Sequence, residues 1–269
     1  MRVLITGAAG KIGRTLRAGL AGVYDHLSLL DIIPQDPAGP GESCLTVDIG
    51  DLAAMTKAMQ GIDCVVHLAG MPIEPEDNVW PQVLSGNIVG SYNAFEAAKQ
   101  AGVKRMVYAS SHHAIGFYRR EQTITANVAP RPDSYYGASK VFSEALGRLY
   151  ADKFGMSVAC MRIGAFRPKP ADVRHLSVWL SPDDSVRLVR ACIDAPKFSY
   201  CTVYGISANT RAFWDNREAA ILRYAPRDNA EDYAAEILSS GEPEKDVAKP
   251  FHGGWYCAMG FESDVSQVD

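Results

Sequence analysis

Residues 2–22, RVLITGAAGKIGRTLRAGLAG, decide the fold. Residues 2–6 form a short run that is typical of a buried strand, and residues 12–22 carry apolar side chains at helical spacing. The glycine-rich segment between them forms the turn. Together they predict one unit of strand, turn and helix.

Gly7, Gly10 and Gly13 occupy this turn with the spacing GxxGxxG. Glycines at such a turn allow the backbone to approach a pyrophosphate, which then lies at the positive end of the helix dipole. Glycines that serve only packing are the alternative. The position between a first strand and its helix favours a dinucleotide site.

The strand and helix pattern continues to about residue 165. Because near-continuous apolar strands alternate with helices, we predict an α/β fold with a doubly wound, Rossmann-type parallel sheet. Residues 1–165 are expected to form the nucleotide-binding core, and residues 166–269 a small substrate-binding cap that is not an independent domain. Strands are predicted at 2–6, 26–31, 43–48, 63–69, 105–111 and 157–164, and helices at 52–60, 90–102, 139–155, 183–195 and 229–240.

The composition excludes several classes of function. The net charge is −4, without a block of basic residues, so nucleic acid is not an expected partner. No apolar run reaches the roughly 18 residues that a membrane span requires, and we expect a cytoplasmic protein without membrane contact. The 6 cysteines are scattered, which favours buried thiols over a zinc site, and no metal is expected.

Asp31 ends the second predicted strand, where an acidic side chain can accept hydrogen bonds from the hydroxyls of the adenosine ribose. Its charge would repel a 2′-phosphate. Lys11 and Arg14 favour NADP, but Asp31 holds the discriminating position, so NAD is the predicted cofactor. The alternative is that Asp31 only begins the following loop.

Two adjacent tyrosines precede a lysine in YYGASK, residues 135–140. On a helix, Tyr136 and Lys140 differ by about 40° and share a face, whereas Tyr135 lies about 140° from Lys140. A free tyrosine has a pKa near ~10, and a cation about 4 Å away lowers it by about three units. Tyr136 is therefore the predicted base.

The motifs TGAAGKIG (6–13), HLAG (67–70), GNIVGSYN (86–93), YASS (108–111) and YGASK (136–140) occur in this order. In this the chain resembles the extended short-chain dehydrogenase/reductase family. The resemblance implies that Ser111 hydrogen-bonds the reacting oxygen, that Tyr136 takes its proton, and that Lys140 lowers the pKa of Tyr136 and binds the nicotinamide ribose. It also implies a set of cofactor contacts: Gly7, Gly10, Lys11, Ile12, Gly13, Asp31, Ile32, Asp48, Ile49, Leu68, Ala69, Gly70, Asn87, Ser110, Tyr136, Lys140 and Ile163.

Within that family the chain is similar to bacterial uronate dehydrogenases, through segments 110–118, 162–170, 174–184 and 206–216. This likeness implies oxidation of free D-glucuronate or D-galacturonate at C1, with NAD, to an aldarolactone. Arg174 offers a planar fork for the substrate carboxylate; a solvated surface arginine is the alternative. The other expected substrate contacts are Ser111, His112, His113, Tyr136 and Ala165. His112 and Ala165 differ from the family pattern, which has asparagine and serine there.

Two other functions remain open at this stage. A nucleotide-sugar epimerase would use the same tyrosine and lysine and retain its NAD, although only about 105 residues follow Ile163. A dinucleotide sensor would be expected to lack the tyrosine and lysine pair. By analogy with dehydrogenases of this fold, we expect a homo-oligomer.

Overall fold

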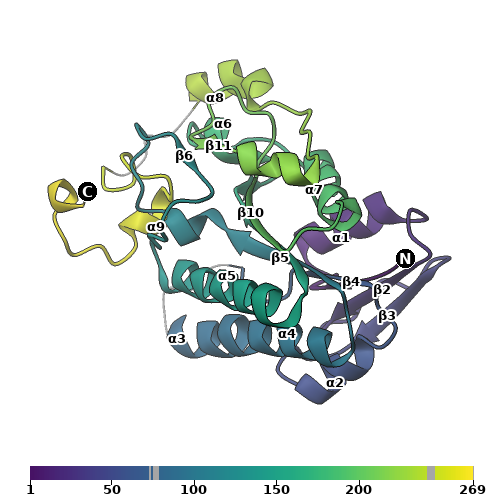
Figure 1. Cartoon of the computed structure of the whole chain (residues 1–269). Coiled ribbons are helices and arrows are strands. Elements are labelled where there is room, and N and C mark those ends of the chain that lie inside the picture. Colours follow the sequence, from purple (N-terminus) through teal and green to yellow (C-terminus); the bar gives the residue numbers. More distant parts are fainter. Residues whose placement is uncertain (73, 75–78, 241–245, 269) are drawn as a thin grey trace.

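A parallel sheet forms the centre of the molecule in the computed structural model, which describes residues 1–72, 74, 79–240 and 246–268 (Figure 1). Within these residues the sheet has seven strands in the order β10-β7-β5-β4-β1-β2-β3. Every neighbouring pair is parallel. The strands are β1 (Arg2–Thr6), β2 (His26–Asp31), β3 (Glu42–Thr46), β4 (Cys64–His67), β5 (Arg105–Ser111), β7 (Ser157–Ile163) and β10 (Tyr200–Gly205).

Helices cover both faces of this sheet, as the doubly wound prediction requires. One face is covered by α1 (Lys11–Leu20) and α7 (Pro182–Asp194), which contact each other; Leu16 and Leu188 belong to the same buried cluster. The other face is covered by α2 (Leu52–Ala58), α4 (Gly90–Gln100) and α5 (Tyr135–Phe154) (Figure 1). There Phe95 and Tyr150 pack against strand residues in a second cluster. Each such aromatic or aliphatic side chain contributes about 1.5–3 kcal/mol by burial.

The six predicted strands are confirmed, with β3 and β4 shorter than expected. Helix α5 begins four residues before the predicted start, because Ser134 caps it by accepting a hydrogen bond from the backbone N–H of Gly137 at 3.0 Å. Strand β10 was not predicted. The predicted helix at 229–240 is divided into a 3₁₀ turn, η4 (Ala230–Tyr233), and α8 (Ala234–Ser240).

Residues beyond 165 contribute to the sheet layer, because β10 and α7 come from this range. The division of the chain into a nucleotide-binding core of residues 1–165 and a substrate-binding cap of residues 166–269 stays a prediction. No helix in the described part of the chain is long and apolar enough to cross a membrane. The remaining elements are α3 (Val79–Gln82), η1 (Val83–Val89), η2 (His112–Ile115), β6 (Ile124–Thr125), β8 (Ala165–Phe166), α6 (His175–Val178), β9 (Trp179–Leu180), β11 (Trp214–Asp215), η3 (Arg217–Leu222), α9 (Trp255–Ala258) and η5 (Val265–Gln267).

The carboxyl ends of the parallel strands meet at one edge of the sheet, where ligands bind in open α/β folds. Gly7 follows β1, Asp31 ends β2, Leu68 follows β4, Ser111 ends β5 and Ile163 ends β7. The topology thus brings the predicted cofactor-binding and catalytic residues to the same edge.

Candidate active site

The glycine turn between β1 and α1 is shaped for close approach of a ligand to the backbone. Gly7 has a φ of 70°, and a Cβ on it would lie 2.8 Å from the backbone nitrogen of Ala69. A Cβ on Gly13 would lie 2.6 Å from Ala8 Cα. Gly10 precedes α1 without a side-chain cap. The first N–H groups of the helix are therefore available to a pyrophosphate, and the residues present fit a dinucleotide.

Asp31 is tied to this turn. Its Oδ2 accepts a hydrogen bond from the backbone N–H of Ala9 at 2.9 Å, and its Oδ1 accepts one from Ile32 at 2.8 Å. The half-buried carboxylate stands at the end of β2, beside the exposed Ile32. Ile12 is half-buried in the first turn of α1, and Lys11 is exposed there.

The other expected cofactor contacts line the same edge. Asp48 Oδ1 accepts a hydrogen bond from the backbone N–H of Gly50, and Ile49 packs so closely on Gly90 that a Cβ there would collide with it. Gly70, after Leu68 and Ala69, has a φ of 144°, and a Cβ on it would lie 2.8 Å from Asn87 Oδ1.

Asn87 holds two parts of the site together. Its Oδ1 accepts a hydrogen bond from the backbone N–H of Met71 at 2.7 Å, and its Nδ2 donates to Ser139 Oγ at 3.1 Å. The segment after β4 is thereby connected to α5. Asn87 is 1% exposed, and its cofactor contact stays a prediction.

The two tyrosines of α5 face opposite ways. Tyr136 is 8% exposed, whereas Tyr135 is 59% exposed and contacts Trp80. Lys140 is buried, and its Nζ lies 5.4 Å from the centre of the Tyr136 ring. The predicted shared face of Tyr136 and Lys140 is thus present in the structure.

Burial and charge act in opposite directions on Tyr136. Desolvation raises the pKa of its phenol above the ordinary value, whereas the positive charge of Lys140 and a hydrogen bond with Ser111 lower it. Burial is the largest of these influences, so the net pKa is raised. From the charge of Lys140, the pKa of Tyr136 is predicted to lie near neutrality. Lys140 acts in the expected direction, but burial outweighs it.

Lys140 is held at its outer end by strand β5. Its Nζ donates to the carbonyl of Ala109 at 2.9 Å and to the hydroxyl of Tyr108 at 3.4 Å. The Tyr108 hydroxyl also lies 3.1 Å from Ser91 Oγ. These bonds orient the ammonium group beneath Tyr136 without neutralising its charge, because none of these partners is a carboxylate.

The hydroxyl groups of Ser110 and Ser111 have different hydrogen-bond partners. Ser111 Oγ accepts a hydrogen bond from the backbone N–H of His113 at 3.2 Å and lies beside Tyr136. Ser110 Oγ donates to Glu144 at 2.6 Å, and Glu144 also pairs with the buried Arg162 at 2.8 Å. The Ser110 hydroxyl therefore belongs to a buried polar network, and its cofactor contact stays a prediction.

His112 connects the end of β7 with Arg174. Its Nδ1 lies 2.9 Å from the carbonyl oxygen of Ile163, which can only accept, so Nδ1 carries a proton. Burial lowers the pKa of His112 well below its ordinary value, which leaves Nε2 as an acceptor. Arg174 donates to this Nε2 at 3.3 Å and to the carbonyl of His252 at the same distance.

The structure therefore gives His112 a partner that the sequence did not predict. His112 was expected to contact the substrate itself, but both of its ring nitrogens are occupied by Ile163 and Arg174. Ala165, also expected near the substrate, begins β8 and pairs with Trp179 of β9.

His113 pairs with Asp133, which sequence analysis missed. Its Nδ1 lies 2.7 Å from Asp133 Oδ2, and its ring stacks on Tyr256 of α9 at 3.9 Å. Glu74 also reaches this region: its carboxylate accepts a hydrogen bond from the backbone N–H of Tyr136 at 2.8 Å. Asp133 lies only three residues before Tyr136 in the sequence. Tyr256 is distant in the sequence, and the fold places it near Tyr136.

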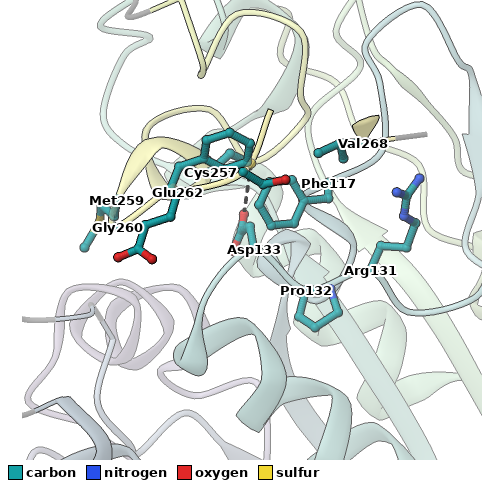
Figure 2. Close-up of a pocket in the computed structure, with 11 residues that line it drawn as sticks. Phe117, Arg131, Pro132, Asp133, Cys257, Met259, Gly260, Glu262 and Val268 are labelled. Atoms are coloured by element: carbon teal, nitrogen blue, oxygen red, sulfur yellow. Dashed lines mark hydrogen bonds between the residues drawn. The ribbon is translucent and has the colours of Figure 1, made fainter. Parts of the chain in front are cut away.

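A surface hollow of about 490 Å³ lies beside this pair, and Figure 2 shows residues that line it. Phe117, Asp133 and Cys257 are among its lining residues, and Ser111 and Tyr136 are not. The hollow therefore borders the site and is not the place where the reaction is expected. Among the described residues no group of three histidine, cysteine or acidic side chains could hold a metal ion.

The arrangement as a whole suits proton transfer at an alcohol. A hydroxyl near Ser111 and Tyr136 would meet a hydrogen-bonding hydroxyl, a phenol and, beneath them, a fixed cation. The glycine turn lies at the same sheet edge. Arg174 adds a second positive group, joined to the catalytic residues through His112 and His113, whose ring centres lie 4.0 Å apart.

Residues 3–176 match the model of the NAD dependent epimerase/dehydratase family. Uronate dehydrogenase of Pseudomonas putida is 40% identical over 261 residues, which are 96% of each chain. A mutant uronate dehydrogenase of Agrobacterium tumefaciens, solved in complex with NAD, is 42% identical, with a TM-score of 0.90 and coverage of 96% of this chain and 97% of the other. Glucuronic acid dehydrogenase of Chromohalobacter salexigens is 40% identical, with a TM-score of 0.90 and coverage of 96% of both chains. The chain belongs to the NAD dependent epimerase/dehydratase family.

Proposed function

We propose that this protein is an NAD-dependent uronate dehydrogenase that oxidises free D-glucuronate or D-galacturonate at C1 to the aldarolactone. The observation that carries the proposal is the connection of Arg174 to the catalytic residues. Arg174 bonds His112, and the His113 ring lies 5.8 Å from that of Tyr136. Similarity to enzymes named for uronate and glucuronic acid supports the same substrate class.

The glycine turn and Asp31 would hold NAD, which would supply the acceptor for the hydride from C1. The chain itself handles the proton of the C1 hydroxyl. Ser111 orients that hydroxyl, and Tyr136, as the phenolate, takes the proton when the C1–O double bond forms. Because Lys140 stabilises the phenolate electrostatically, it opposes the burial that raises the pKa of Tyr136.

The substrate carboxylate is bound, in this proposal, by the guanidinium of Arg174. A guanidinium offers two parallel N–H groups that match the two carboxylate oxygens. The bonds from Arg174 to His112 and His252 hold the group in place before substrate arrives. A sugar without a carboxylate lacks this partner and is expected to react poorly.

The sheet edge supplies the cofactor contacts. Asp31, held by Ala9, would accept hydrogen bonds from the ribose hydroxyls and repel the 2′-phosphate of NADP. The homo-oligomer and the cytoplasmic location stay predictions.

Free sugars and sugar acids, assayed with NAD by NADH absorbance, test this function. We expect NADH from glucuronate and galacturonate and little from glucose and galactose. If NAD stays bound through gel filtration and no uronate yields net NADH, the protein is not a uronate dehydrogenase, and an epimerase that retains its cofactor becomes the better explanation.

A further inference from the structure

We infer that Asp133 is a positioning residue of this site: its carboxyl group holds the His113 ring through Nδ1 and sets whether His113 Nε2 donates or accepts a hydrogen bond toward a sugar oxygen. The inference rests on the proposed function in one respect, that the substrate is a sugar lying beside Tyr136. Asp133 itself does not touch the reacting atoms.

The Asp133 carboxyl group is completely enclosed. Its side chain has 0% exposure, and its Oδ2 lies 2.7 Å from His113 Nδ1. Its Oδ1 accepts a hydrogen bond from Ser134 Oγ at 2.8 Å. The thiol of Cys257 approaches Oδ2 at 3.8 Å, the dashed contact in Figure 2. Both oxygens therefore have partners inside the protein.

Two glycines keep the carboxyl group in this place. A Cβ added to Gly116 or to Gly253 would collide with Asp133 Oδ2. The two glycines come from segments far apart in the sequence, after η2 and before α9. Space for the carboxyl group thus depends on the absence of a side chain at both positions.

The His113 ring is fixed from its other sides as well. It stacks on Tyr256 at 3.9 Å with 28° between the ring planes, and its centre lies 4.0 Å from that of His112. Its side chain keeps 10% exposure. Among the described residues the hydrogen bond of the His113 ring is the one between Nδ1 and Asp133. Nε2 is therefore the nitrogen that remains for a ligand.

The number of protons shared by Asp133 and His113 decides whether His113 Nε2 donates or accepts a hydrogen bond. With no added proton, Nδ1–H donates to the carboxylate and Nε2 accepts. With one added proton, Nε2 carries hydrogen and donates, and this holds whether the proton belongs to Asp133 or to the imidazole. The hydrogen-bonding role of Nε2 therefore depends on the number of protons on the pair and not on which member holds the shared proton.

Titration of the pair falls near neutral pH. Burial raises the pKa of Asp133 to about 7, and burial, followed by the charge of Arg174, lowers the pKa of His113 well below its ordinary value. The other titratable groups around the pair come from three elements and a loop: His112 of η2, Tyr136 of α5, Tyr256 and Cys257 of α9, and Glu74. Nε2 is then an acceptor above neutral pH and a donor below it.

Nitrogen NMR of the wild-type protein tests the inference without any substrate. Histidine ¹⁵N shifts distinguish the two neutral tautomers, and His113→Phe, which keeps an aromatic ring against Tyr256, assigns the signal. At pH 9 we expect hydrogen on Nδ1. Hydrogen on Nε2 at pH 9 would overturn the inference, because a carboxylate cannot donate to Nδ1.

Kinetics of Asp133→Asn test the consequence for function. We expect kcat/KM for the uronate to fall about 10- to 100-fold, the loss of one hydrogen bond to a charged group, with NAD affinity unchanged. The limb of the pH profile near neutrality should disappear. In the His113→Phe background, Asp133→Asn should change kcat/KM less than about twofold, because it acts through His113. Equal losses in both backgrounds would overturn the inference.

Asp184→Asn is the matched control. Asp184 is also fully buried and accepts hydrogen bonds from the backbone of Arg227 and Asp228, away from the site. This variant should lower the Tm and leave kcat/KM unchanged. If wild type oxidises no uronate, the proposed function fails, but the NMR measurement still decides the role of Asp133. If Asp133→Asn does not fold, that same measurement decides it.

Discussion

The cofactor half and the substrate half of the site are built differently. Residues 2–31 provide the glycine turn, the open end of α1 and the carboxylate of Asp31, all within one continuous unit of strand, helix and strand. The proposed substrate half combines Ser111, Tyr136, Arg174 and Tyr256, which come from four separate segments. In the first half the backbone makes the site, and in the second half side chains do.

This difference decides how a substitution acts. In the cofactor half, a carbon atom added to a glycine of the turn collides with backbone atoms, so the backbone has to shift. In the substrate half a changed atom removes one chemical group and leaves the fold in place.

Tyr136→Phe removes one oxygen from the substrate half. We expect turnover to fall about 100- to 10,000-fold, the range for loss of a general base, while the Tm and NAD affinity stay close to wild type. Initial rates and NAD titration measure both. The control is Tyr135→Phe, which changes an exposed ring on the neighbouring position and should keep most of the activity. The opposite order of losses would refute the assignment.

Gly13→Ala adds one carbon to the cofactor half. The new Cβ would lie 2.6 Å from Ala8 Cα, so the turn has to shift, and we expect a loss of about 3 kcal/mol in the free energy of unfolding together with weaker NAD binding. Gly10→Ala is the comparison, because its Cβ meets only Gly7 O, at 3.2 Å. Urea unfolding and NAD titration measure both variants. Equal effects would show that the turn is less rigid than described.

Substitution of His67 tests how the stability of the folded protein depends on pH. It ends β4, bonds Thr6 at 2.8 Å, and burial lowers its pKa to about 3. The unfolded chain binds a proton at His67 below an ordinary pKa of ~6.5 and the folded chain does not, so stability falls as the pH decreases from 6.5 toward 3. At pH 5 this amounts to about 2 kcal/mol relative to pH 7. His67→Gln should remove this part of the slope in urea unfolding; an unchanged slope would mean that His67 is not the group responsible.

Asp31→Ala removes a charge from the cofactor half and has the smallest expected effect. NAD affinity should fall about tenfold and discrimination against NADP should relax, since roughly one charged hydrogen bond and the repulsion of a 2′-phosphate are lost. Titration with both cofactors measures this. If wild-type protein already uses NADP as well as NAD, Asp31 does not select the cofactor.

The same contrast explains what could be predicted from the sequence. The strands and the glycine turn follow local patterns, so the strand, turn, helix and strand of residues 2–31 were correctly predicted. The shared face of Tyr136 and Lys140 also follows from helical spacing alone. Strand β10 was missed although YCTVYG carries aromatic and β-branched residues, because the preceding segments lack a regular alternation.

The partners of the two histidines were not predictable in this way. Asp133 meets His113 with its carboxyl group packed against Gly116 and Gly253, which are far apart in the sequence. Arg174 meets His112 because α6 is placed against the end of β7. Such contacts depend on how distant segments pack, and no periodicity within one segment reports them. For the same reason, the net effect of burial on the pKa of Tyr136 required the structure.

The most direct test of the proposed function combines one substitution with one change of substrate. Initial rates are measured for wild type and Arg174→Ala on glucuronate and galacturonate, and on glucose and galactose, which carry a hydroxymethyl group in place of the carboxylate. We predict a loss of roughly 2–5 kcal/mol in kcat/KM on the uronates, partly restored in Arg174→Lys, and little or no loss on the neutral sugars. Equal losses on uronates and neutral sugars would contradict the account, because Arg174 would then support the fold or the cofactor and not the carboxylate.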